Sequence, residues 1–438
     1  MMGVKKSLNR QILELAIPSM LAGITIPLVG MADTAIAGRL GSATAIGGIA
    51  IGSTLFDLLY WNFGFLRVGT AGITAQAFGR GDRHDIVRTG LQGIVIALAF
   101  SLLLILIQWP FANLVLWLSP SSPEVEAMAK EYFFIRIWAA PAVLSLFVFR
   151  GWFIGVQNTL ASMIMDVVIN IANIGFSLFL ALNLGMGIKG IALGTVIAQY
   201  IGIVCGIFLL FVYYRKMVRY VSPALVFRKD GWKKYFNLSG NLFVRSVCML
   251  LIYTGFTFLA AKYGDTLLAV ATIMMKLLLL FAYFVDGFAY AGEALTGKFI
   301  GARNRPALMK SIKLLLIWGS GVGVVSTILY IAGDQLFLRL MTSTPEVIQA
   351  AQPFLPWLYT MPLISCLTFM WDGIFIGATA GKALRNTMII SVAAFYVFYL
   401  ALEGSLGIQS LWIGYAAHLV ARSVSQTIMA RKHVFNAI

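Results

Sequence analysis

The sequence predicts an all-α polytopic membrane protein, with twelve transmembrane helices in two pseudo-symmetric six-helix lobes. Three observations predict this fold class. Of 438 residues, 60% are hydrophobic and only 11% are charged, whereas soluble domains carry about 25% charged residues. Apolar runs long enough to cross a bilayer follow one another along the chain. Sequence landmarks also recur at one constant offset, which indicates an internal duplication.

Twelve apolar segments are expected to cross the membrane, because one spanning helix needs about 20 mostly apolar residues. The first follows MMGVKKSLNRQ, which has two lysines but no short apolar core with a small-residue cleavage site. We therefore expect a first helix there and no removable signal peptide. The predicted spans are residues 11–38, 43–74, 86–117, 124–154, 159–183, 187–213, 236–261, 266–300, 307–333, 346–376, 385–403 and 407–430.

Basic residues gather in every second connection between these spans, and they account for the net charge of +16. By the positive-inside rule, both termini are predicted to be cytoplasmic. The charge then reports orientation and contact with anionic lipid headgroups. Nucleic acid is not an expected partner, since no basic stretch is interleaved with stacking aromatic residues. The connections opposite to these hold little beyond Arg39, Lys189, Lys262 and Arg339.

An internal repeat relates the two halves of the chain. The shift that carries Thr74 onto Thr296 superposes three separate landmarks without a gap. Six spans in each half make two lobes with the same orientation in the membrane. We expect an N-lobe at 1–214, a cytoplasmic linker at 215–234 and a C-lobe at 235–438. The superposed landmarks are TAQAFGRGDR (74–83) on TGKFIGARNR (296–305), the tripeptide PEV at 123–125 on 345–347, and GWFIG (151–155) on GIFIG (373–377).

Residue types that carry enzyme or metal chemistry are sparse and scattered. Cys205, Cys248 and Cys366 lie far apart, and so do the three histidines. Neither a disulfide framework nor a metal cluster is readable from such spacings. A membrane-embedded enzyme would need a nucleophile with a base or a metal cluster, and the histidines supply neither. We expect no enzyme activity, no metal centre and no cofactor.

Several motifs carry a resemblance to a known family. The first helix, AIPSMLAGITIPLVGMADTAIAGRLGS, places Pro27 six residues before Asp33. That helix resembles helix 1 of the MATE (multidrug and toxic compound extrusion) family. The segments FLRVGTAGITAQAFGRGD, FRGWFIGVQN, GMGIKGIALGTVIAQY and WDGIFIGATAGKALRN are similar to its DinF-like branch.

The resemblance covers nearly the whole chain and implies a function. It implies an antiporter that exports organic, often cationic or amphipathic compounds in exchange for protons or sodium ions. We expect a multi-pass monomer in a bacterial inner (plasma) membrane. Small organic substrates and membrane lipids are its expected partners.

Asp33 is the foremost candidate for coupling. A carboxylate inside a span costs a few kcal/mol on insertion scales, so it usually faces a cavity or a partner. Carboxylates in apolar, partly dry cavities hold a proton nearer to neutral pH, which a proton-coupled antiporter requires. Pro27 lacks a backbone N–H, so helix 1 can bend there. Protonation of Asp33 and bending at Pro27 are predicted to drive substrate release. The alternative is an Asp33 that only packs against a neighbouring helix.

Helix 5 carries a polar stripe of Asp166, Asn170, Asn173 and Ser177, at helical spacing on one face. Family likeness aligns Asn173 with an asparagine that is followed, four residues later, by an acid. Here Ser177 stands at the acid's position. The family likeness also adds Thr195 of helix 6 to this polar network. One carboxylate fewer weakens the case for a tight sodium site. Interhelical hydrogen bonding alone could also explain these residues.

The C-lobe has a second charged set. Asp286 and Glu293 are seven residues apart on one helix and so share a face. Buried charges normally pair, so this set is either an ion-pair network that locks the lobe or a secondary ion site. Its members are Arg245, Lys276, Asp286, Glu293 and Asp372.

Other charged residues are weaker signals. Asp166 is expected to line a vestibule, and Arg150 to extend toward the membrane surface. Arg136 could be a charge partner or a gate, and His418 a hydrogen-bonding residue.

Two further functions stay open at this point. A sodium-coupled multidrug antiporter would share the fold and differ in the coupling ion. A lipid-linked oligosaccharide flippase of the same superfamily would be expected to show a strongly basic central cavity and often fourteen spans. The few arginines in the middle of the predicted spans argue against the flippase.

Overall fold

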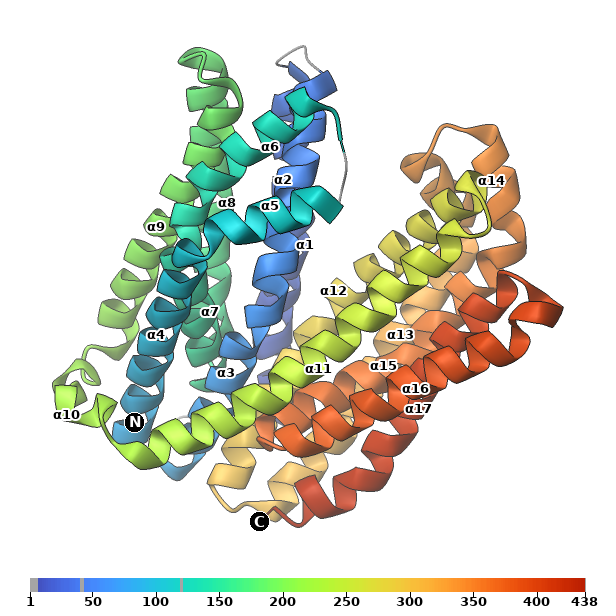
Figure 1. Cartoon of the computed structure of the whole chain (residues 1–438). Helices are drawn as coiled ribbons and strands as arrows, with labels where there is room; N and C mark the ends of the chain where they lie inside the picture. The colour runs from blue at the N-terminus through green and yellow to red at the C-terminus, as the bar shows by residue number, and fades with distance from the viewer. Residues whose placement is uncertain (1–6, 40–42, 119–120, 438) are drawn as a thin grey trace. The chain divides into compact units, whose positions relative to one another are not determined.

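A computed structural model describes residues 7–39, 43–118 and 121–437, and all regular secondary structure in these ranges is helical. Figure 1 shows long helices joined by short turns. The α-helices are α1 Leu8–Arg39, α2 Ala43–Trp61, α3 Phe65–Arg80, α4 Arg83–Leu106, α5 Gln108–Leu118, α6 Pro123–Arg136, α7 Ala140–Gly155, α8 Thr159–Leu178, α9 Gly187–Tyr214, α10 Pro223–Val226, α11 Lys229–Ala261, α12 Asp265–Gly301, α13 Arg305–Met341, α14 Pro345–Ala351, α15 Leu355–Gly377, α16 Gly381–Leu406 and α17 Gln409–Ala430.

Two compact units divide the chain. The N unit comprises Leu21–Tyr235, and the C unit comprises Met1–Met20 together with Phe236–Ile438. Helix α1 is therefore shared, because its first turns pack against α12. There, a Cβ on Gly287 would lie 2.7 Å from the carbonyl oxygen of Ala16. The lobe boundaries expected from the sequence (1–214, 215–234 and 235–438) stay a prediction.

Among the described residues, eleven helical segments are long and apolar enough to cross a membrane. The all-α polytopic fold class is thereby confirmed. The twelfth predicted span, 407–430, forms α17, a 22-residue helix that lies outside this set of apolar segments. Buried His418, Arg422 and Gln426 lower its apolar character.

Four predicted spans consist of two α-helices in tandem. In the span 86–117, α4 ends before Ile107 and α5 begins after it. In the other three, a single 3₁₀ turn joins α2 to α3, α6 to α7, and α14 to α15. In the last of these, Pro353 lies in the turn and Pro356 is the second residue of α15. Proline cannot supply the N–H that a continuous helix needs there. The turns are Asn62–Gly64, Ile137–Ala139 and Gln352–Phe354.

The predicted duplication is confirmed in the backbone. Helices α2, α4, α6, α8 and α9 of the N unit begin at the repeat offset from α12, α13, α14, α16 and α17 of the C unit. Asp82 and Asn304, which correspond at the same offset, both cap the following helix by accepting a hydrogen bond from a backbone N–H. Positive φ angles recur in the same way: Gly81 (72°) with Arg303 (53°), Gln157 (63°) with Thr379 (53°), and Gly185 (65°) with Gly407 (53°).

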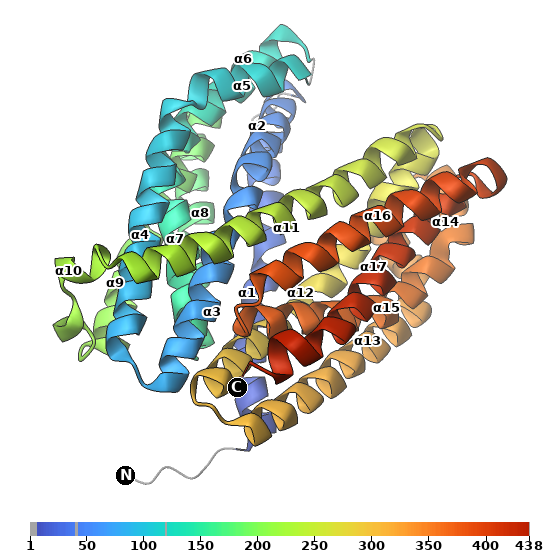
Figure 2. The same ribbon diagram turned by 60° about the horizontal axis from the view of Figure 1, so that its bottom comes forward.

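Helix packing within each unit repeats as well. Helix α7 packs on α3 in the N unit, and α15 packs on α12 in the C unit; the latter pair and α16 beside α17 are visible in Figures 1 and 2. A Cβ on Gly151 would clash with the carbonyl oxygen of Arg67. A Cβ on Gly373, the counterpart of Gly151, would clash with that of Ala289, the counterpart of Arg67. The GWFIG and GIFIG motifs thus mark close contacts between helices.

Candidate functional site

Asp33 lies in the second half of α1, within the N unit. Its side chain is buried, with 6% exposure. Its Oδ1 atom accepts no hydrogen bond within the described part of the chain. A buried carboxylate oxygen without a donor is energetically unfavourable, so this atom is suited to bind a proton or a cation.

Arg136, the last residue of α6, is the basic group whose charge acts on Asp33. Its guanidinium donates to the hydroxyl of Tyr132 at 2.5 Å and lies over the ring of Phe56, 4.8 Å from the centroid. It interacts electrostatically with both Asp33 and Asp57. No ion pair within 4.0 Å joins it to either acid in the described residues. Arg136 therefore attracts Asp33 without neutralising it by direct contact.

The polar stripe of α8 makes contacts in two directions. The Asn170 amide donates to the hydroxyl of Thr25 on α1 at 2.6 Å. The Asn173 amide donates to the hydroxyl of Thr195 on α9 at 2.9 Å. Three of the four predicted network residues, Asn173, Ser177 and Thr195, thus meet at the α8–α9 contact, whereas Asn170 ties α8 to α1.

Small residues on α9 make the α8–α9 contact close. Ser177 and Thr195 both donate to the carbonyl oxygen of Ile191, at 3.4 and 3.1 Å. A Cβ on Gly194 would lie only 2.6 Å from the backbone nitrogen of Ser177. Small residues at every fourth position let two membrane helices approach in this way. The run on α9 is Gly190, Gly194, Ala198, Gly202 and Gly206.

Asp166 and Arg150 form an ion pair across α7 and α8. The Nε atom of Arg150 donates to Oδ1 of Asp166 at 2.6 Å, and both side chains are largely buried. Arg150 is therefore a partner of Asp166, and the expectation that it extends to the membrane surface is wrong. Pairing offsets part of the desolvation cost of burying these two charges.

The Pro27 side chain lies outside the described residues. The helix α1 itself runs without interruption over this position. The bend at Pro27 stays a prediction.

The charged set of the C unit centres on Asp372 of α15. Its Oδ2 accepts from Arg245 of α11 at 2.5 Å and also from Arg422 of α17. Its Oδ1 accepts from Gln426 at 2.6 Å. Asp372 and Arg422 are 7% and 5% exposed. One carboxylate therefore joins three helices.

The other three residues of the predicted C-lobe set lie on α12. Lys276 is exposed, Asp286 is partly buried and Glu293 is fully buried. Sequence reasoning included Arg245 and Asp372, but it missed Arg422 and Gln426. Their spacing of four residues on α17 was the available signal.

Metal binding finds no support in the described ranges. They contain no group of three or more His, Cys, Asp or Glu side chains that could hold a metal ion. In the described part of the N unit, Asp166 is paired with Arg150, whereas the buried carboxylate of Asp33 interacts electrostatically with Arg136 and Tyr132.

Comparison with known proteins places this geometry in a family. The MatE family model matches residues 18–179 and again residues 242–402. The chain is 33% identical to DNA damage-inducible protein F of Escherichia coli K12, covering 98% of this chain and 93% of that protein. It is 23% identical to a probable multidrug resistance protein NorM of Thermotoga maritima, covering 95% and 90%.

A solved structure of MATE in the bent conformation has a similar fold. Its TM-score is 0.88 at 17% identity, with 98% of this chain and 96% of that one covered. The family model matches one segment in each half of the duplication, and the E. coli relative spans almost the whole chain. The chain belongs to the MATE family, a family of membrane transporters rather than of enzymes.

Proposed function

We propose that this transporter exports small organic compounds of cationic or amphipathic character in exchange for protons, with Asp33 as the proton-binding group. The observation that carries the proposal is the buried Oδ1 of Asp33, which accepts no hydrogen bond within the described residues. A proton or a substrate cation would each compensate the buried charge. Because one carboxylate cannot bind both fully, proton uptake releases the substrate.

Arg136 makes the position of α1 depend on whether Asp33 is ionised. Its guanidinium is held by Tyr132 and Phe56, so it stays in place when Asp33 changes its charge. While Asp33 is ionised, Coulombic attraction draws α1 toward the end of α6. Protonation removes that attraction and shifts the balance between two arrangements of α1.

Helix α1 is the moving element in this proposal. Pro27 lacks an N–H and weakens the helix six residues before Asp33. The Asn170–Thr25 hydrogen bond anchors α1 to α8 just before that point. Bending beyond the anchor narrows the space between α1 and the rest of its lobe and expels the substrate. Return to the inward-facing state releases the proton to the cytoplasm.

The remaining predicted groups have supporting roles. Asn170, Asn173, Ser177 and Thr195 form a polar network on one side of the N-lobe, which lies at 1–214, and the linker at 215–234 leads to the C-lobe at 235–438. The network around Asp372 locks the C-lobe. The protein acts as a monomer in a bacterial inner membrane, with both termini cytoplasmic, as the basic connections indicate.

The test is transport of a fluorescent organic cation in proteoliposomes, first under a proton gradient and then under a sodium gradient. Proton-driven efflux is expected for the unmodified chain and its loss for Asp33→Asn. Asp57→Asn is the matched control, because Asp57 is an exposed acid within range of the same guanidinium. If Asp33→Asn carries out proton-driven efflux at the same rate as the unmodified chain, the proposal is wrong. Efflux driven by sodium alone would indicate the sodium-coupled alternative.

A further inference from the structure

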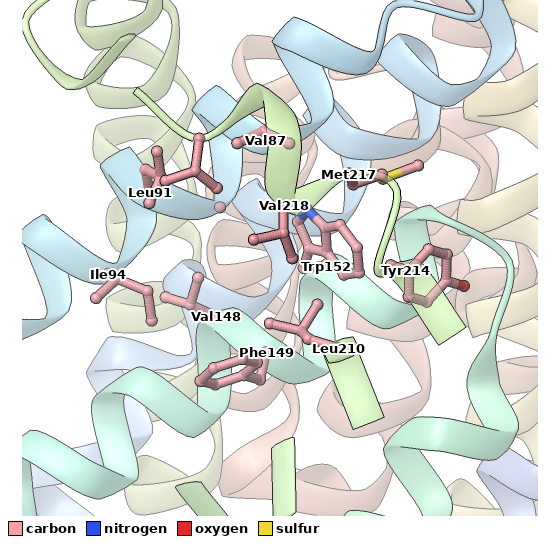
Figure 3. A pocket seen from close by; sticks show the side chains of 12 residues that line it. Val87, Leu91, Ile94, Val148, Phe149, Trp152, Leu210, Tyr214, Met217 and Val218 are labelled. Atoms are coloured by element: carbon pink, nitrogen blue, oxygen red, sulfur yellow. The ribbon is translucent and has the colours of Figure 1, made fainter. Parts of the chain in front are cut away.

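An apolar cavity of about 200 Å³ lies within the N unit, between α4, α7 and α9. Figure 3 shows its lining, with Leu91 and Ile94 contributed by α4, Val148 and Trp152 by α7, and Val218 by the segment that follows α9. None of these side chains has been assigned to the transport site. The lining of the cavity is almost wholly apolar, so the cavity is suited to an apolar chain.

The walls of the cavity are held in place. The indole N–H of Trp152 donates to the carbonyl oxygen of Ile86 at 3.0 Å, which joins α7 to α4. Tyr214 packs edge-on against Trp152, with 5.0 Å between the ring centroids. Val218 and Val221 form a rim that is 40% and 51% exposed. The cavity is therefore preformed, with an apolar rim facing outward.

A basic groove adjoins this cavity and shares Tyr214 and Met217 with it. The groove has a volume of about 550 Å³ and is lined by Arg83, Arg215, Lys216 and Arg219. All four cations are exposed.

No carboxylate within the described ranges lies at ion-pair distance from these four side chains. The acid closest in sequence to Arg83 that forms ion pairs, Asp85, is already bound by Arg80 and Arg88, at 2.8 and 2.5 Å. The groove therefore has positive charge available for an external anion.

We propose that the cavity and the groove together bind one anionic phospholipid, with an acyl chain in the cavity and the phosphate among Arg215, Lys216 and Arg219. The neighbouring apolar and cationic surfaces match the two ends of such a molecule. Basic pockets between transmembrane helices are known to bind anionic headgroups. A free anion would leave the apolar cavity unused, and a neutral apolar molecule would leave the cations unpaired.

The site lies where the chain leaves α9 on its way to α11. A lipid held there contacts α4, α7 and the segment after α9 at the same time. It is separate from Asp33 and does not depend on which ion drives transport. An experiment that finds no lipid at this site would therefore not contradict the proposed function.

Native mass spectrometry of the purified full chain tests the proposal, by titration with phosphatidylglycerol and with phosphatidylcholine of the same acyl chains. Tighter binding of phosphatidylglycerol is expected. The triple variant Arg215→Gln, Lys216→Gln, Arg219→Gln should weaken it at least about tenfold, since each cation near a membrane surface contributes measurably to lipid binding. The matched control removes three exposed cations from the C unit: Arg303→Gln, Arg305→Gln, Lys310→Gln. It should change the affinity less than twofold.

A second variant tests the apolar half of the site. Val218→Trp places a larger side chain at the exposed rim of the cavity, so it should weaken binding of long-chain phosphatidylglycerol severalfold. In the unmodified chain, a phosphatidylglycerol with brominated acyl chains should quench tryptophan fluorescence, and Trp152→Phe should remove that part of the quenching. Unchanged affinity in the triple variant or in Val218→Trp overturns the proposal. An equal loss in the matched control, or equal binding of both lipids by the unmodified chain, overturns it as well.

Discussion

Replacement of Asp372 by asparagine should strongly destabilise the C unit. Arg245 and Arg422 both donate to the same oxygen, Arg245 at 2.5 Å, so their guanidinium nitrogens lie at most about 5 Å apart. Without the carboxylate, two buried positive charges face each other. At an effective dielectric constant near 20, their repulsion amounts to about 3 kcal/mol, which agrees with the roughly 3–5 kcal/mol lost when a buried pair is broken.

The assay for this prediction is thermal unfolding in detergent, followed by tryptophan fluorescence. A loss of about 3 kcal/mol corresponds to a decrease in Tm of roughly 6–12 °C for a unit of about 220 residues. The informative comparison is the double variant Asp372→Asn, Arg422→Gln, which restores the original net charge of the cluster. It should be more stable than Asp372→Asn alone.

Two results would refute the reasoning. One is a double variant no more stable than the single one, because then charge repulsion is not the cause. The other is a Tm within 2 °C of the unmodified chain for Asp372→Asn. Measured in the same preparation, loss of transport at full stability would favour the alternative of a secondary ion site in the C-lobe.

Two further predictions concern the N unit. Gly194→Ala should lower the Tm, because overpacking costs about 1–3 kcal/mol and the new Cβ would lie 2.6 Å from the backbone nitrogen of Ser177. Gly175→Ala on the neighbouring helix should be tolerated, since nothing lies within 4 Å of its Cβ position, and equal effects on Tm would contradict this packing. Asp166→Asn and Arg150→Gln should each lower the Tm, whereas the double variant should lose less than the two single losses combined. Additive losses would show that the ion pair contributes nothing.

Much of the fold could be predicted because the bilayer imposes simple rules. Backbone groups in lipid must be satisfied within the segment itself, so apolar runs of sufficient length become helices. The constant offset between the halves, visible in three short landmarks, recurs in helix starts, caps and positive φ angles. The breaks within spans were not predicted. Each break is a short change of backbone conformation, such as the 3₁₀ turn Ile137–Ala139. The hydrophobic pattern continues through such a turn and does not indicate it.

The candidate site could be predicted only in part. Periodicity places Asn170 and Asn173 on one face of a helix, but it does not say which helix each one meets. The structure directs Asn170 to α1 and Asn173 to α9. The pairing of Asp166 with Arg150 was missed for the same reason, because the two residues lie on different helices.

The sequence by itself determined the fold class, the duplication, the family likeness and the choice of Asp33 as the foremost acid. These features follow from composition, from spacing along the chain and from the cost of placing a charge in a membrane. Only the tertiary structure decided the partners of each charge: Arg136 beside Asp33 without direct contact, Arg422 and Gln426 on Asp372, and a basic groove next to an apolar cavity. Partner choice depends on how helices distant in sequence pack, and one-dimensional periodicity carries no information about which faces meet.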